Sequence, residues 1–231
     1  MKLTLVAVIL LAFFFSGCGN NSNPGCGGGD LVVGQAVYVA NTGSNSISVF
    51  DNAEIPICTG APGSSYFTLA PVSGSPYSVN APPTALAGEW LSPATSPPAI
   101  DNTLFVASAS AKTIAIYNVD SNTGALKNLV TTLSAQYIPE ALIIGANNVI
   151  YVADAEGYVS AYTYSNGALT EIPGSPFPAG TDPVAIAQGS TGDIYVANAG
   201  SNNISGYSAD VTGVLTPLPG SPYPTGTSPS V

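Results

Sequence analysis

Two carboxylates near the middle of the chain, Asp154 and Glu156, are the residues whose types and spacing best suit chemistry. Two neighbouring carboxylates can bind a calcium ion or divide the roles of general acid and general base. However, Asp154 ends the segment IYVAD, and Asn41 and Asn198 end two similar segments. An Asx side chain that caps a turn, with Glu156 in solvent, is therefore the alternative interpretation.

Basic catalytic groups are nearly absent from the chain. It has three lysines, no arginine and no histidine. A Ser-His-Asp triad needs histidine, and bidentate binding of phosphate usually needs arginine. The segment GCGGG at 25–29 lacks the Gly-Lys-Ser ending of a phosphate-binding loop. We assign no catalytic residue, no metal and no cofactor, and the balance is against an enzyme.

The net charge is −10, although only 7% of the residues are charged. Nucleic-acid binding requires lysines and arginines to neutralise phosphates, so this class of partner is excluded. The acidity is most simply explained by solubility.

The N-terminus predicts export. Lys2 precedes the apolar run LTLVAVILLAFFF at 3–15, which has the length of a signal-peptide core. The segment FSGC at 15–18 resembles the lipobox of bacterial lipoproteins, which implies lipidation of Cys18. Residues 1–18 are then a signal peptide, and the Gly- and Asn-rich residues 19–35 are a flexible tether. The expected location is extracytoplasmic, in the bacterial cell envelope, as a periplasmic or outer-membrane lipoprotein; ordinary secretion with a free Cys18 is the alternative.

Two cysteines remain, Cys26 and Cys58. They could form a disulfide in an oxidising compartment or stay as unpaired thiols. Their spacing matches no zinc-site pattern.

Four similar segments reveal an internal repeat: VYVAN at 37–41, LFVAS at 104–108, IYVAD at 150–154 and IYVAN at 194–198. The last three begin about 45 residues apart, a period typical of propellers. Each segment is followed by an alternating strand such as SISVF at 46–50 and then, in three repeats, by GAL or GVL. Three of them follow a segment of the form P-x-x-[IL]-[AI], at 83–87, 139–144 and 183–187.

Four short β-rich segments per repeat predict an all-β fold, a β-propeller of four-stranded blades. We expect about three and a half to four blades within residues 36–231, near 36–82, 83–138, 139–182 and 183–228. The phrases PGSPF at 173–177 and PGSPY at 219–223 are expected to place their prolines at the end of the outermost strand, where a missing N–H costs no ladder bond.

These motifs together resemble the YVTN-repeat family and the related lactonase-type propellers of seven blades. The resemblance covers residues 36–229. It implies lactone chemistry by acidic and basic side chains that converge on a central channel, and this chain supplies few basic ones. Because a closed propeller usually has more blades, we expect either a piece of a longer propeller, which is favoured, or a ring completed by a second copy.

The expected function is therefore a lipid-anchored propeller that presents a binding surface for protein or polysaccharide. A lactonase-like hydrolase, inactive as a fragment, is the alternative. The expected partners are the membrane, through the lipid, and an unidentified protein or polysaccharide, with self-association through open blade faces. Tyrosines gather near 151–164, where they either pack within the sheet or bind carbohydrate.

Overall fold

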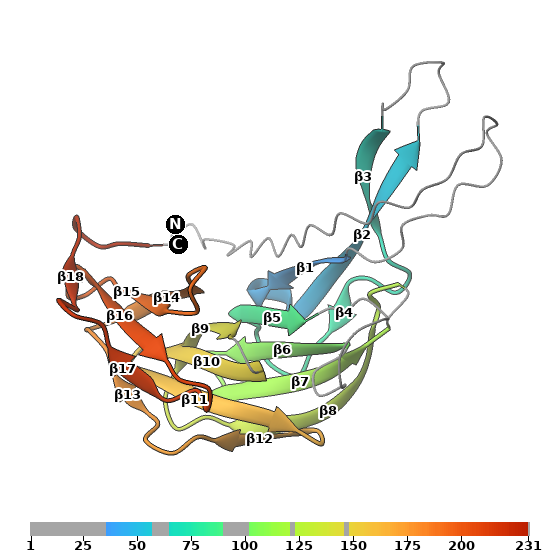
Figure 1. Ribbon diagram of the computed structural model, residues 1–231. Coiled ribbons are helices and arrows are strands. Elements are labelled where there is room, and N and C mark those ends of the chain that lie inside the picture. The colour runs from blue at the N-terminus through green and yellow to red at the C-terminus, as the bar shows by residue number, and fades with distance from the viewer. Residues whose placement is uncertain (1–35, 57–64, 90–101, 121–122, 146–147, 231) are drawn as a thin grey trace.

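The computed structural model describes residues 36–56, 65–89, 102–120, 123–145 and 148–230. They form four separate antiparallel sheets, arranged one after another as the blades of a propeller (Figure 1). The innermost strands lie toward the concave side of the arc and the outermost strands toward its convex side. The all-β propeller fold expected from the repeats is confirmed.

The blades follow the order of the repeats along the chain. Blade 1 consists of β1 (Ala36–Asn41), β2 (Ser46–Pro56), β3 (Ser65–Pro71) and β4 (Tyr77–Ser78), with a 3-10 turn η1 at Thr42–Ser44. Blade 2 consists of β5 (Ala85–Glu89), β6 (Thr103–Ser108), β7 (Thr113–Val119) and β8 (Leu126–Ser134). Blade 3 consists of β9 (Pro139–Ile144), β10 (Val149–Asp154), β11 (Tyr158–Ser165), β12 (Ala168–Glu171) and β13 (Phe177–Pro178). Blade 4 consists of β14 (Pro183–Gln188), β15 (Ile194–Asn198), β16 (Asn203–Ala209), β17 (Leu215–Pro217) and β18 (Tyr223–Pro224).

Burial along the strands of the YVAN type distinguishes inner blades from terminal ones. All six residues of β6 and all six of β10 are buried, because blades 2 and 3 are covered on both faces. In β1 and β15 buried and half-buried residues alternate instead. This period of two is expected of a sheet that is covered on only one face.

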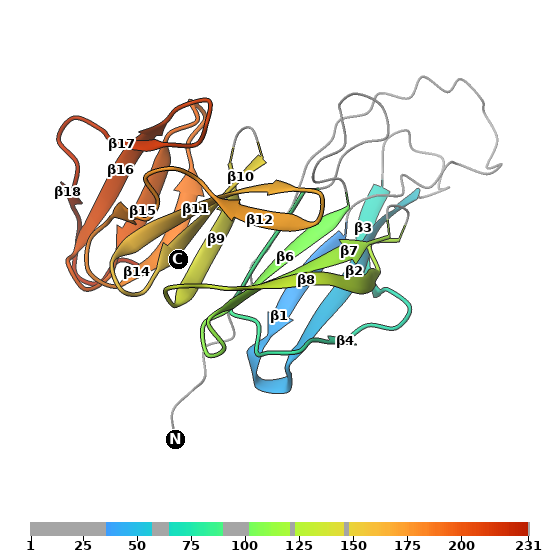
Figure 2. The same cartoon turned by 90° about the horizontal axis from the view of Figure 1, so that it is seen from below.

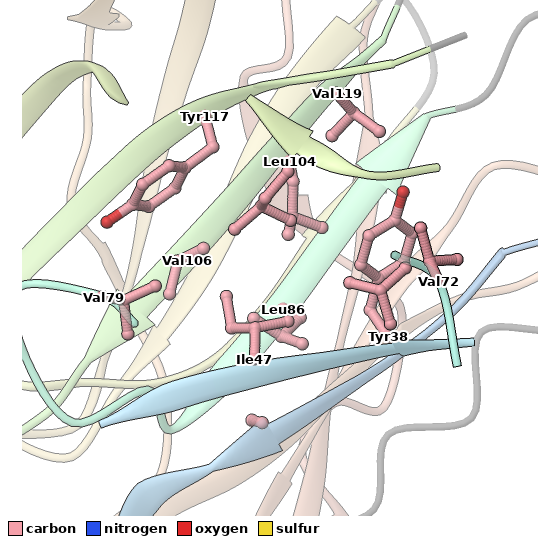
Figure 3. Close-up of a cluster of buried hydrophobic side chains, with 12 residues drawn as sticks. Tyr38, Ile47, Val72, Val79, Leu86, Leu104, Val106, Tyr117 and Val119 are labelled. Atoms are coloured by element: carbon pink, nitrogen blue, oxygen red, sulfur yellow. The ribbon is translucent and has the colours of Figure 1, made fainter. Parts of the chain in front are cut away.

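Three apolar cores lie between successive blades. Figure 3 shows the first, in which Tyr38 and Ile47 of blade 1 meet Leu86, Leu104 and Val106 of blade 2. The second joins blades 2 and 3, and the third joins blades 3 and 4. Blades 2 and 3 therefore offer one face to the blade before and the other face to the blade after, whereas blades 1 and 4 pack on one described neighbour each.

A repeated Gly-Ser-Pro turn interrupts the outer edge of three blades. The hydroxyls of Ser75, Ser175 and Ser221 accept hydrogen bonds from backbone N–H groups of β2, β11 and β16, at 2.8, 3.0 and 2.9 Å. The following residues return to pair with the same strand as β4, β13 and β18. The prolines follow the end of the outermost strands β12 and β17, as expected from the sequence. What the sequence did not indicate is that the chain then returns to the same sheet, and that a serine hydroxyl in the turn supplies the missing acceptor. Blade 2 lacks the motif, and its outer strand β8 runs unbroken for nine residues.

Cys18, Cys26 and Cys58, on which the lipidation and disulfide predictions depend, lie outside the described residues. Within the part of the chain that the structure describes, no helix has the length and apolar character needed to cross a bilayer.

Candidate functional site

The predicted site residues lie on one end of the blades, which we call the loop face. It is formed by the hairpins β1–β2, β6–β7, β10–β11 and β15–β16, and by the crossings into the next innermost strand. In blade 3, Asp154 at the end of β10 pairs with Pro139 at the start of β9. In blade 4, Asn198 pairs with Pro183 in the same way. Figure 2 shows the four blades from a second direction.

Asp154 is buried on this face, with 1% of its surface exposed. Its Oδ2 accepts hydrogen bonds from the Ser160 hydroxyl at 2.6 Å and from the Ser160 N–H at 3.2 Å. Burial raises the pKa of Asp154 to about 7, and the two bonds from Ser160 lower it only in part. The carboxyl is thus a buried group that ties the end of β10 to β11.

The equivalent positions of the other blades carry amides or a hydroxyl. Asn198 Nδ2 donates to Ser205 Oγ at 3.0 Å, and Asn41 Nδ2 donates to Ser48 Oγ at 2.8 Å. In blade 2 the position is Ser108, which is also buried. In blades 1, 3 and 4 a polar side chain at this position therefore binds a serine of the following strand, and Asp154 is the ionisable one of the three. Ser108 instead contacts Ser110 and Ala111 within its own hairpin.

Glu156 points to a different set of partners. Its Oε1 lies 3.1 Å from Lys112 Nζ of blade 2, and its Oε2 accepts a hydrogen bond from the Ile138 N–H at 2.8 Å. Partial burial raises the pKa of Glu156, but these two interactions outweigh it, and the net pKa is lowered. Because Asp154 and Glu156 are bound to separate partners, they do not form a carboxylate pair.

Lys112 occupies a backbone position that does not favour lysine. Its φ is +50°, in the left-handed region, where the equivalent hairpin positions hold Asn45, Gly157 and Asn202. Asparagine and glycine adopt this conformation more readily than lysine does. The lysine places its ammonium group against blade 3, so the hairpins of blades 2 and 3 meet through an exposed ion pair.

Beside this ion pair two tyrosines stack on the loop face. The ring centroids of Tyr137 and Tyr158 are 4.7 Å apart, and the rings are inclined by 28°. Both side chains are half-buried, and Gln136 Nε2 donates to the Tyr137 hydroxyl at 3.2 Å. Tyr137 comes from the crossing between blades 2 and 3, and Tyr158 begins β11. The pair forms an aromatic surface between two blades.

Glu140 is a third acidic group of this region. Burial raises its pKa, and the charges of Asp182 and Glu156 add to the effect. Even so, no three acidic, histidine or cysteine side chains come together to hold a metal ion within the described residues.

The sequence singled out Asp154 and Glu156 but missed the groups around them. Lys112, Tyr137 and Glu140 were not selected. Of the tyrosines near 151–164, three are buried, and only Tyr158 contributes to the loop face. The available signal was that Tyr137 lies two residues before the innermost-strand segment PEALII, at a crossing onto this face.

Comparison with known proteins identifies the fold only. No family model and no curated protein matches the chain. Solved structures do. A protein from Bacteroides uniformis, provisionally assigned as a 6-phosphogluconolactonase, matches with a TM-score of 0.62 and 15% identity, over 87% of this chain and 55% of its own. A similar Bacteroides fragilis protein gives 0.61 and 15%, over 86% and 55%.

The periplasmic gluconolactonase of Pseudomonas aeruginosa matches with a TM-score of 0.57 and 16% identity, over 87% of this chain and 55% of its own. The chain therefore spans about half the length of these solved structures. Their shared architecture, together with the four sheets described above, establishes a fold of the lactonase-type propellers.

Proposed function

We propose that this chain is a carbohydrate-binding β-propeller of the YVTN-repeat type, held at the bacterial cell envelope by a lipid on Cys18. The observation that carries the binding function is the stacked pair Tyr137 and Tyr158 on the loop face. Sugar rings present C–H groups that pack on aromatic faces, while their hydroxyls need nearby donors and acceptors.

The surroundings of the pair suit a polyhydroxylated ligand. Gln136, Lys112 and Glu156 place an amide, an ammonium and a carboxylate on the same part of the loop face. With a net charge of −10 and three lysines in the whole sequence, the chain repels polyanions. We therefore favour a neutral polysaccharide over an acidic one.

Binding should depend on the aromatic ring of Tyr137 rather than on the fold. The protein lacking residues 1–18 is titrated calorimetrically with a panel of neutral and acidic polysaccharides, and Tyr137→Leu is compared with Tyr137→Phe. Leucine should weaken binding about tenfold, a loss of about 1.4 kcal/mol, whereas phenylalanine retains most of it. Equal affinity of both variants, or binding only to a protein partner, would refute a carbohydrate site here.

The proposed location at the cell envelope is tested by a separate experiment. Replacement of the proposed lipid-bearing Cys18 by Ser should shift the protein from the membrane fraction to the soluble fraction after cell breakage. Continued membrane retention of this variant would overturn lipid anchoring, and it would leave the carbohydrate site untouched.

A lactonase-like hydrolase is the second candidate. It is favoured by the fold shared with the lactonases named above and by two carboxyls with raised pKa, Asp154 and Glu140, on one face. A group that titrates near neutrality suits general acid–base catalysis. Hydrolysis of sugar lactones that is lost in Glu140→Gln would favour this candidate, whereas absence of turnover in the unmodified protein supports binding alone.

A further inference from the structure

The repeats provide an internal comparison for the residues of the loop face. Each blade has an equivalent hairpin on this face, and equivalent crossings lead from one blade to the next. The hairpins at 42–45 and 199–202 contain only threonine, glycine, serine, alanine and asparagine. Because repeats of one architecture share the requirements of that architecture, the propeller itself does not need large or charged side chains at these places.

Four large side chains depart from this pattern. Lys112 and Glu156 are the only charged residues in the four hairpins at 42–45, 109–112, 155–157 and 199–202. Tyr137 lies two residues before the first proline of an innermost strand, and smaller residues hold this position in two other crossings, namely Ala81 and Thr181. Tyr158 begins β11, whereas the corresponding strands begin with smaller residues, namely Ser46, Thr113 and Asn203.

The four departures lie together at one place, between blades 2 and 3. Lys112 Nζ is 3.1 Å from Glu156 Oε1, and the ring centroids of Tyr137 and Tyr158 are 4.7 Å apart. Glu156 Oε2 links the two pairs, since it accepts a hydrogen bond at 2.8 Å from the N–H of Ile138, the residue after Tyr137. Residues that the propeller does not require have thus gathered into one contact network, which indicates a shared role.

Glu156 fixes the backbone beside Tyr137. The carbonyl of Ile138 accepts a hydrogen bond from the Ala155 N–H at 2.9 Å, and blade 4 has the equivalent bond from the Ala199 N–H to the Asp182 carbonyl at 2.8 Å. That bond therefore belongs to the repeat. The bond from the Ile138 N–H to Glu156 is the additional one, and it limits the positions that the neighbouring Tyr137 ring can take.

Lys112 is explained neither by its backbone conformation nor by stability. Its φ of +50° lies in the left-handed region, which disfavours a long side chain, and the equivalent residues Asn45 and Asn202 suit that region better. The side chains of Lys112 and Glu156 are 48% and 33% exposed, so their ion pair contributes little to folding. A residue that is kept in an unfavourable conformation without a gain in stability points to a functional role.

We propose that Lys112 and Glu156 are positioning residues of the carbohydrate site. Lys112 orients the Glu156 carboxylate, and Glu156 holds the crossing so that the Tyr137 ring stays stacked on Tyr158 and available to a sugar. The part of this inference that concerns a ligand rests on the proposed function. The positioning of Tyr137 is a property of the free protein and can be measured without a ligand.

The first test uses the full chain in detergent micelles without ligand, observed by NMR. Glu156→Ala removes the acceptor, so the Ile138 amide should exchange with solvent about tenfold faster, and the ring resonances of Tyr137 should shift. Glu156→Gln keeps a carbonyl acceptor and should retain most of the protection. Lys112→Asn should speed the exchange less than Glu156→Ala does, because the acceptor remains but loses its ionic partner.

The second test is calorimetric titration of the same proteins with dextran, mannan and galactan as neutral polysaccharides. Lys112→Asn should weaken binding about fivefold, while its midpoint in urea stays equal to that of the unmodified chain or rises. Lys127→Asn is the matched control, because it makes the same substitution in an exposed ion pair, with Asp120 at 2.9 Å, at the other end of β7. This variant should bind like the unmodified chain.

The two tests separate the possible failures. Unchanged Ile138 exchange in Glu156→Ala, equal affinity of the two lysine variants, or weaker binding by Lys112→Asn with no change in Ile138 exchange would each overturn the positioning role. If the unmodified chain binds none of the three polysaccharides, the carbohydrate function fails, and the exchange measured on the free protein still decides whether Glu156 and Lys112 position Tyr137.

Discussion

Replacing Asp154 by Asn should stabilise the protein at neutral pH and leave its stability at acid pH nearly unchanged. Burial raises the pKa of this carboxyl from 3.8 to about 7, so the folded state binds the proton more tightly than the unfolded state does. The contribution of Asp154 to the free energy of unfolding is therefore fully present below about pH 4, falls between about pH 4 and pH 7, and is lost above. Asparagine cannot titrate, and the equivalent Asn198 shows that the position accepts an amide that bonds to a serine of the third strand.

The size of the expected gain in stability follows from the pKa shift of Asp154. About three pKa units correspond to about 4 kcal/mol. Urea denaturation at intervals between pH 4 and pH 8 should show the advantage of Asp154→Asn growing to about 2–4 kcal/mol and levelling off above pH 7.

Asp210→Asn is a matched control, for which the change in stability at neutral pH should have the opposite sign. The hydroxyl and N–H of Thr212 hold the pKa of Asp210 below its usual value. Asp210→Asn should therefore cost stability at neutral pH, and that cost should disappear as the pH falls through the lowered pKa. A difference between Asp154→Asn and the unmodified protein that does not change with pH would refute the assignment of Asp154 as a buried carboxyl with a raised pKa.

Two further substitutions test the architecture by urea denaturation. Ser175→Ala removes the acceptor of the Ala161 N–H and should cost about 1–2 kcal/mol, and an effect near zero would contradict the role of the Gly-Ser-Pro turn. Gly213→Ala should cost about 2 kcal/mol or more, because its φ is +89° and a Cβ would lie 2.8 Å from a methyl group of Val149 in blade 3, whereas Gly226→Ala, where no atom lies within 4 Å, should be nearly neutral.

The strands could be predicted from the sequence because their signals are local and repeated. Three of the four segments of the YVAN type became the second strand of their blade, and VYVAN became β1, the first described strand of blade 1. The segments PTALA, PEALII and PVAIA became innermost strands within a residue or two. A period near 45 with turn residues between the strands leaves few other architectures. The serine of the Gly-Ser-Pro turn could not be predicted, since its role depends on a hydroxyl that replaces a backbone acceptor across the sheet.

The candidate site was only partly predictable, because it joins residues of different blades. Asp154 and Glu156 are two positions apart, yet one faces Ser160 and the other faces Lys112, which is 44 residues distant in the sequence. The stack of Tyr137 on Tyr158 likewise depends on where the crossing between blades 2 and 3 runs. Neither juxtaposition has a signature in local sequence.

The carbohydrate site itself is tested most directly by hydrogen–deuterium exchange with and without a bound neutral oligosaccharide. Slower amide exchange on binding should be confined to the crossing that contains Tyr137 and to the hairpin that leads from Glu156 to Tyr158. This result would place the ligand on the loop face between blades 2 and 3. Protection elsewhere on the propeller, with these two segments unchanged, would contradict the proposed site.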